Sequence, residues 1–159
     1  MPEIIKRKAR AVLFDRQGRL VLIKRTRPGR DPYWVTAGGG VEPEDAGVEA
    51  ALRREVFEEL GGRVDRVREV VVITDERPEG TLVQHVFVAR LTETDPSSRT
   101  GPEFSDPARG TYETVVLPGT AEALGSIRLL PEPLARFLED NLRGLRALVA
   151  DSRTGPPGG

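Results

Sequence analysis

Cysteine is absent from this sequence of 159 residues, and there is only one histidine. The absence of cysteine excludes a disulfide framework, a thiolate nucleophile and a cysteine-ligated zinc ion. No apolar run approaches the length of a membrane span, and the first ten residues carry five charges rather than an apolar leader. We therefore expect a cytoplasmic protein without a membrane partner, in which any metal ion is held by oxygen ligands.

The two signs of charge are balanced. Lys and Arg number 24, Asp and Glu number 25, and the formal net charge is −1. No field of one sign then spans the molecule to hold a nucleic-acid polymer or an anionic membrane. An anionic ligand would have to be bound by a local group of residues.

The chain length suits a single domain, predicted over residues 1–150, followed by a disordered tail over 151–159. Apolar and β-branched runs predict strands, and the 3.6-residue period predicts two helices. The expected strands are 8–15, 19–25, 33–36, 67–74, 82–91 and 111–117, and the expected helices are 45–60 and 132–149. We interpret Gly38–Gly40 as a turn, Asp45 as a helix cap, and residues 92–110 as a polar loop. Strands mostly in meander order with two helices predict an α+β fold, an α/β/α sandwich with helices on both faces of a mixed sheet.

The first predicted helix carries carboxylates on its apolar side. Glu55 and Glu59 are i, i+4 neighbours within the apolar stripe, with Glu58 beside them. Like charges at this spacing repel, and burying them without a partner is costly. A divalent cation such as Mg²⁺, which prefers carboxylate oxygen, would satisfy the arrangement.

The alternative is an ordinary solvated acidic face paired with Arg53 and Arg54. That interpretation places the charges on the side of the helix that should pack against the sheet, and it leaves Phe57 on the exposed side. Phe57 would instead meet another helix, a loop or a second copy of the chain, which allows for a homodimer.

The segment from Gly40 to Gly62, GVEPEDAGVEAALRREVFEELGG, resembles the Nudix box. Its second half matches the pattern at Arg54-Glu55-Val56, Glu58-Glu59 and Gly61. Two positions depart from the pattern: Ala46 stands where an early Glu is expected, with Glu44 and Asp45 adjacent, and Gly62 stands at a final apolar position. Similarity to MutT-like members extends at lower specificity over residues 8–149.

The resemblance implies hydrolysis by water at a phosphorus of a diphosphate linkage, with Mg²⁺ (or Mn²⁺) as cofactor. Glu55, Glu58 and Glu59 would be the metal ligands, and one of them could orient the water. Arg54 would hold these carboxylates by charge-assisted hydrogen bonds. The backbone of Gly38 could offer a carbonyl to the metal, and Gly39 and Gly40 could approach a phosphate, although each glycine could equally belong to a simple turn.

Residues outside the box supply further candidates. Arg25, then Arg27, is the expected phosphate clamp, and a solvated loop cation is the alternative for Arg27. Glu113 is the candidate base or additional ligand because MutT-like enzymes often have a glutamate there, and Glu103 competes with it. Phe104 is the preferred aromatic residue for stacking a nucleobase. Tyr33, Trp34 and Tyr112 are other candidates, and a core position is favoured for Trp34. For His85 we expect a structural role in the sheet.

The predicted function is Mg²⁺-dependent hydrolysis of a phosphoanhydride bond in a nucleoside diphosphate-linked substrate. That substrate would be a nucleoside triphosphate, oxidised ones included, or a dinucleoside polyphosphate. An ADP-ribose or nucleotide-sugar pyrophosphatase is an alternative, for which Pro78 is the family clue. A second alternative is a nucleotide-sensing module without catalysis, but such modules would be expected to lose ligand carboxylates. A purely structural domain would leave the inward acidic patch unexplained.

Overall fold

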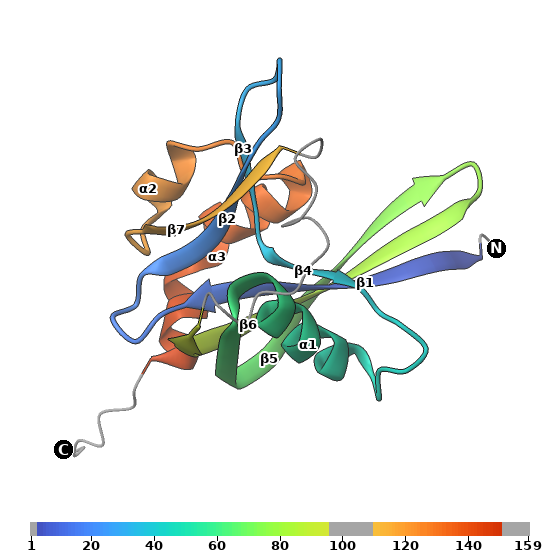
Figure 1. The fold of residues 1–159 in the computed structure, drawn as a ribbon, viewed down its shortest axis with the longest axis horizontal. Coiled ribbons are helices and arrows are strands. Elements are labelled where there is room, and N and C mark those ends of the chain that lie inside the picture. The colour runs from blue at the N-terminus through green and yellow to red at the C-terminus, as the bar shows by residue number, and fades with distance from the viewer. Residues whose placement is uncertain (1–2, 96–109, 151–159) are drawn as a thin grey trace.

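A mixed seven-stranded sheet forms the centre of the protein (Figure 1). The computed structural model describes residues 3–95 and 110–150. The strands are β1 (Ile4–Phe14), β2 (Leu20–Thr26), β3 (Tyr33–Val35), β4 (Ala37–Gly40), β5 (Gly62–Arg77), β6 (Gly80–Thr94) and β7 (Thr111–Leu117). The helices are α1 (Val48–Leu60), α2 (Ala121–Gly125) and α3 (Glu132–Val149). Among the described residues, no helix is long and apolar enough to cross a membrane.

The strand order is β3-β2-β1-β6-β5, with β4 paired to β1 and β7 paired to β2. The prediction of a mostly meander order was wrong, because β1 runs parallel to β6, more than sixty residues further along the chain. Strand β1 pairs with β2 only at Leu13 and Phe14, and the rest of that edge pairs with β4. The sheet therefore divides beside β4, and the start of β1 and the β5–β6 hairpin extend together to one side (Figure 1).

Helices cover both faces of the sheet, which confirms the predicted α+β class. Helix α1 buries Ala51, Leu52 and Val56 in one apolar cluster. Helix α3 buries leucines at helical spacing in a second cluster on the other face, which also takes Leu124 from α2. Alternating residues of the strands serve the two clusters, as the period of two in a strand requires.

Several predicted boundaries were wrong. Helix α1 begins at Val48, not at Asp45, and Gly47 precedes it without a side-chain cap. The three glycines at 38–40 are strand β4 rather than a turn, with Gly39 opposite Ala9. Strands β5 and β6 reach further than predicted at both ends, so residues 92–94 are strand. The short helix α2 was not predicted at all.

The predicted end of the first helix was right. Gly61 ends α1 in the left-handed conformation at φ 62°, where glycine is favoured, and its N–H donates to the Phe57 carbonyl. Gly62 then enters β5 directly, so the C-terminal end of α1 is fixed to the sheet.

Candidate active site

Two carboxylates of α1 lie against the backbone of β4. Glu59 is only 9% exposed, and the Gly38 N–H donates to its Oε1 over 2.7 Å. Glu55, one turn earlier on the same face, lies beside Gly39. Both carboxylates therefore point toward strand β4 of the sheet.

Strand β4 can approach these carboxylates because it lacks side chains. A Cβ built at Gly39 would lie 2.6 Å from the Glu55 carboxyl carbon, which is closer than real Cβ atoms come to any heavy atom. A Cβ at Gly38 would meet the backbone of Ala9 and Arg10 in β1. The glycines thus form a cradle that places peptide groups next to carboxylate oxygens.

Arg54 links the carboxylates to the loop before α1. Its Nε and Nη2 donate to both oxygens of Asp45 at 3.0 and 2.9 Å, and Nη2 also donates to the Gly40 carbonyl at 3.0 Å. Its Nη1 lies 3.1 Å from Glu55 and 3.3 Å from Glu58. The Arg54 hydrogen bonds hold the pKa of Asp45 below its ordinary value, and the bond from Asp45 raises the pKa of Arg54. The Asp45 side chain thus anchors Arg54 instead of capping the helix.

Glu58 is paired with Arg54 and lies outside the cavity, described below, that the other two carboxylates line. Its side chain is 32% exposed. In the described part of the chain, no three acidic or histidine side chains come close enough together to hold a metal ion. The structure therefore brings Glu55 and Glu59 to one cavity and leaves the third predicted ligand, Glu58, outside it, bridged to Glu55 by Arg54.

A cavity of about 960 Å³ opens beside this pair. Glu55, Glu59 and the three glycines of β4 form one side of it. Five cationic side chains also line it: Lys6, Lys8, Arg10, Arg25 and Arg77. Asp75 and Glu132 line it as well, and Asp75 is paired with Arg77. The other four cations give the chain a local anion-binding surface that its net charge does not provide.

Opposite α1, a row of three side chains crosses neighbouring strands. Arg25 of β2 is paired with Tyr33 of β3 and Tyr112 of β7. Its guanidinium carbon lies 4.0 Å from the Tyr112 ring centroid and 5.7 Å from that of Tyr33. These cation–π contacts fix the orientation of Arg25, and all three residues line the cavity.

Other predicted site residues lie elsewhere. Glu113 is exposed on β7 opposite Lys24 and does not line the cavity, because its neighbour Tyr112 faces that side of the sheet. Arg27 follows β2, is half-buried and does not line the cavity either. Phe104 and Glu103 lie outside the described residues, as does the predicted tail.

His85 and Phe57, for which the sequence predicted roles outside the active site, both lie away from the cavity. His85 bonds through Nδ1 to Glu69 at 2.7 Å and through Nε2 to Arg7 at 2.9 Å. It is a link between three strands, and it does not line the cavity. Phe57 is 37% exposed, with the Arg63 guanidinium 5.8 Å from its ring centroid.

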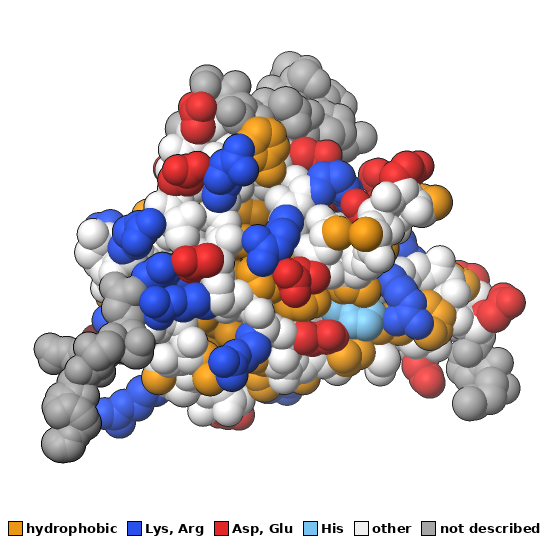
Figure 2. Space-filling model, turned by 90° about the horizontal axis from the view of Figure 1, so that it is seen from below, with side chains coloured by type: hydrophobic (Ala, Val, Ile, Leu, Met, Phe, Trp, Pro, Cys, Tyr) orange, Lys and Arg blue, Asp and Glu red, His pale blue; other side chains and the backbone are white. Residues whose placement is uncertain are grey.

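The structure adds Lys6, Lys8, Arg10 and Arg77 to the predicted site. Strand alternation could have placed Lys6, Lys8 and Arg10 on one face of β1, but only the pairing of β1 with β4 and β6 brings that face to the cavity beside α1. Acidic and basic side chains are interspersed on the face shown in Figure 2, so the cationic lining of the cavity is a local feature.

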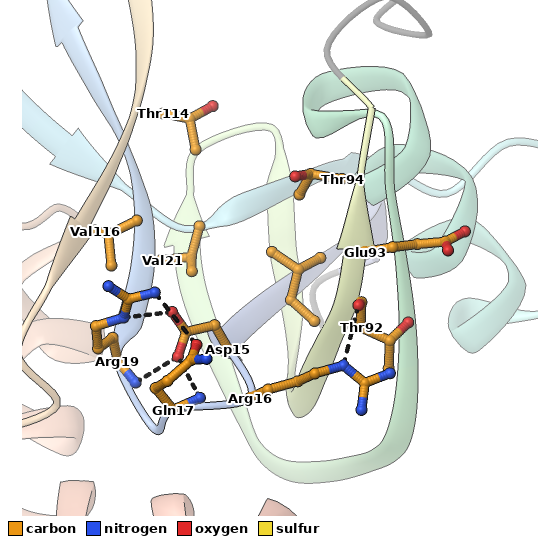
Figure 3. A pocket seen from close by; sticks show the side chains of 11 residues that line it. Asp15, Arg16, Gln17, Arg19, Val21, Thr92, Glu93, Thr94, Thr114 and Val116 are labelled. Atoms are coloured by element: carbon orange, nitrogen blue, oxygen red, sulfur yellow. Dashed lines mark hydrogen bonds and ion pairs between the residues drawn. The ribbon is translucent and has the colours of Figure 1, made fainter.

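A second hollow of about 300 Å³ lies between the β1–β2 turn and the end of β6 (Figure 3). Asp15 binds Arg19 there, and Arg16 donates to the Thr92 carbonyl. No residue of α1 lines this hollow. The carboxylate pair therefore assigns the candidate active site to the larger cavity.

Comparison with known proteins identifies the family to which this sheet and its flanking helices belong. The family model of the NUDIX domain matches residues 5–127, and the chain belongs to this family. A mouse protein named diphosphoinositol polyphosphate phosphohydrolase 3-alpha is 36% identical over 97 residues, which cover 58% of this chain and 55% of that protein. This chain thus matches only about half the length of that relative.

Solved structures share the fold. A MutT NUDIX hydrolase from Burkholderia pseudomallei superposes with a TM-score of 0.55 at 26% identity, covering 85% of this chain and 95% of that one. A NUDIX hydrolase from Nitrosomonas europaea gives a TM-score of 0.68 at 16% identity, covering 89% and 90%. The second likeness concerns the fold alone.

Proposed function

We propose that this protein is a Nudix pyrophosphohydrolase that uses Mg²⁺, or Mn²⁺ in its place, to cut a phosphoanhydride bond. The observation that carries the proposal is the position of Glu55 and Glu59, directed into a cavity that five cations also line. An anionic substrate suits the cations, and a divalent ion suits the carboxylates. Family membership and the names of the relatives support the same reaction class.

The residues present fit the metal. Carboxylates are the ligands that Mg²⁺ prefers. Because residue 39 is a glycine, the Glu55 carboxylate lies directly against the backbone of β4, where a side chain would clash with it. Glu55 and Glu59 would hold the ion, with the Gly38 carbonyl as the additional ligand proposed from the sequence. Glu58, the third carboxylate proposed from the sequence, is paired with Arg54 and does not line the cavity. When bound, the ion neutralises phosphate oxygens and lowers the pKa of a coordinated water.

The chain's own side chains would then position the substrate. Arg25, held between two tyrosine rings, presents donors to a phosphate without losing orientation. Arg54 fixes the carboxylate of Glu55 by a charge-assisted hydrogen bond and thereby preserves the metal-binding geometry. One carboxylate of the pair would orient the attacking water, since Glu113 does not line the cavity.

For the substrate, we propose a nucleoside diphosphate-linked compound. Tyr33 and Tyr112 line the cavity opposite the carboxylates, which supports contact with a planar base. Pro78, the clue for ADP-ribose or nucleotide sugars, lies in the β5–β6 turn and does not line the cavity. A nucleotide sensor without catalysis is disfavoured because both inward carboxylates are present.

A second candidate substrate class is the diphosphoinositol polyphosphates, as in the name of the mouse relative. The five cations that line the cavity favour it, because a ring carrying many phosphates needs more positive charge than one diphosphate does. The pocket's tyrosines favour the nucleotide instead.

A substrate panel tests the proposal. Purified protein with Mg²⁺ is given nucleoside triphosphates, dinucleoside polyphosphates, ADP-ribose and a diphosphoinositol polyphosphate, and released phosphate and nucleotide are measured. We expect turnover of a nucleotide in the wild type and its loss in Glu59→Gln. Glu49→Gln is the matched control, because Glu49 lies on the same helix and pairs with exposed Arg53. Binding without product across the panel would refute catalysis.

A further inference from the structure

A half-buried cation, Arg10, lines the same cavity as the carboxylate pair. Arg10 of β1 lies opposite Gly38 of β4, and the Gly38 N–H holds Glu59. Arg10 also lines the cavity together with Glu55 and Glu59. Its position thus brings a guanidinium to the place where two carboxylates approach each other.

Arg10 is aimed by a buried amide. Its Nε donates to Oε1 of Gln84 on β6 over 3.0 Å, and Gln84 is only 8% exposed. Burial lowers the pKa of the Arg10 guanidinium, and the nearby charges of Glu59 and Glu55 oppose that change. A half-buried guanidinium and two carboxylates that line one cavity each favour the charged form of the other.

Lys8, two residues earlier on the same strand, has a different environment. It lies opposite Gly40 and lines the same cavity. Burial lowers the pKa of its amine first, and then the neighbouring cations Arg10, Lys6 and Arg77 lower it further. Lys8 is therefore surrounded by repulsive charges, whereas Arg10 faces attractive ones.

We propose that Arg10 is, in addition to Arg54, an internal counter-cation of the Glu55–Glu59 pair, and that it stabilises the metal-free protein and opposes the binding of a divalent ion at that pair. The role of Arg10 toward the carboxylates rests on geometry in this chain, and its effect on metal affinity rests on the proposed function. Two positive groups competing for the same carboxylates repel each other, so removing one strengthens the binding of the other.

The metal arm of the test measures Mn²⁺ affinity of the full chain by calorimetry, without substrate. We expect Arg10→Gln to bind Mn²⁺ about tenfold more tightly, which corresponds to about 1.4 kcal/mol of relieved repulsion. Arg10→Lys keeps the charge and is expected to stay close to wild type. Lys8→Gln, the matched control, is expected to change the affinity less than Arg10→Gln. An unchanged or weaker affinity in Arg10→Gln would overturn the proposal.

The second arm needs no metal. In the presence of a chelator, Arg10→Gln is expected to lower the melting temperature, whereas Lys8→Gln is expected to preserve or raise it. If Arg10→Gln alone fails to fold, the double variant Arg10→Gln/Glu59→Gln should regain folding, because it also removes one of the two negative charges that Arg10 attracts. A double variant that is no more stable than Arg10→Gln would refute the counter-cation role.

The two arms separate the two proposals. If the wild-type protein binds no Mn²⁺ while the stability cycle couples Arg10 to Glu59, then the proposed function fails and the counter-cation role stands. If Mn²⁺ binds at the pair but Arg10→Gln changes neither affinity nor stability, the counter-cation role fails alone.

Discussion

Replacing Gly39 by alanine tests the cradle that joins β4 to α1. The added Cβ would lie 2.6 Å from the carboxyl carbon of Glu55, and ordinary contact begins near 3.4 Å. The carboxylate must therefore move by about 0.8 Å, the difference between these distances. A misplacement of roughly 1 Å at a catalytic group can lower the rate about 100-fold.

We expect Gly39→Ala to lower kcat between about 10-fold and 100-fold while the fold survives. The clash involves the end of a flexible side chain, so the free energy of unfolding should change by less than about 1 kcal/mol. Initial rates on the substrate found in the panel, with Mg²⁺ in excess, give kcat, and urea denaturation gives the stability.

Gly144→Ala is the control for the same chemical change. It lies on the exposed side of α3, nothing lies within 4 Å of its added Cβ, and the substitution should leave kcat unchanged. If Gly39→Ala retained full activity with its fold intact, the position of the Glu55 carboxylate beside β4 would have no catalytic consequence, and the reasoning would be refuted.

Three further predictions concern the supports of the site. Gly61→Ala should lower the free energy of unfolding by at least about 1 kcal/mol, because alanine is strained in the left-handed conformation. The added Cβ would also meet the backbone oxygen of Asp95. An unchanged midpoint of urea denaturation would contradict this prediction. Arg54 lowers the pKa of Asp45, so the ion pair between them stabilises the folded protein fully at pH values above 3.8, the ordinary pKa of the group. This stabilisation is lost as the pH falls through the lowered pKa of Asp45. Asp45→Asn should remove that part of the acid dependence, and an identical stability profile would argue against the ion pair. A chelator should abolish turnover, Mg²⁺ should restore it, and Mg²⁺ at about 100 times its Kd should raise stability by about 2.7 kcal/mol.

The inward carboxylates could be foreseen because the information lies within one helix. The 3.6-residue period places Glu55 and Glu59 on the apolar side whatever the helix packs against. The helix end at Gly61 could be predicted from neighbouring residues in the same way, because a glycine that follows an amphipathic helix often ends it in the left-handed conformation. Side chains that act through their own element are thus accessible to sequence reasoning.

The cationic lining was not foreseen because it depends on pairing between distant strands. Lys8 and Arg10 share a face of β1, but only β6 and β4 decide that this face meets α1. Asp45 was misread for a related reason: its local pattern favours a helix cap, while Arg54, nine residues later, takes its carboxylate. Arg54 likewise pairs with Glu58, which does not line the cavity although it is adjacent to Glu59 in sequence.

Mn²⁺ bound in a crystal of the protein, located by its anomalous scattering, tests the central assignment most directly. We predict an anomalous peak at the carboxylates of Glu55 and Glu59, beside the backbone of β4, and loss of that peak in Glu59→Gln. A peak at some other group of residues, with the two glutamates still bonded only to protein, would contradict the assignment.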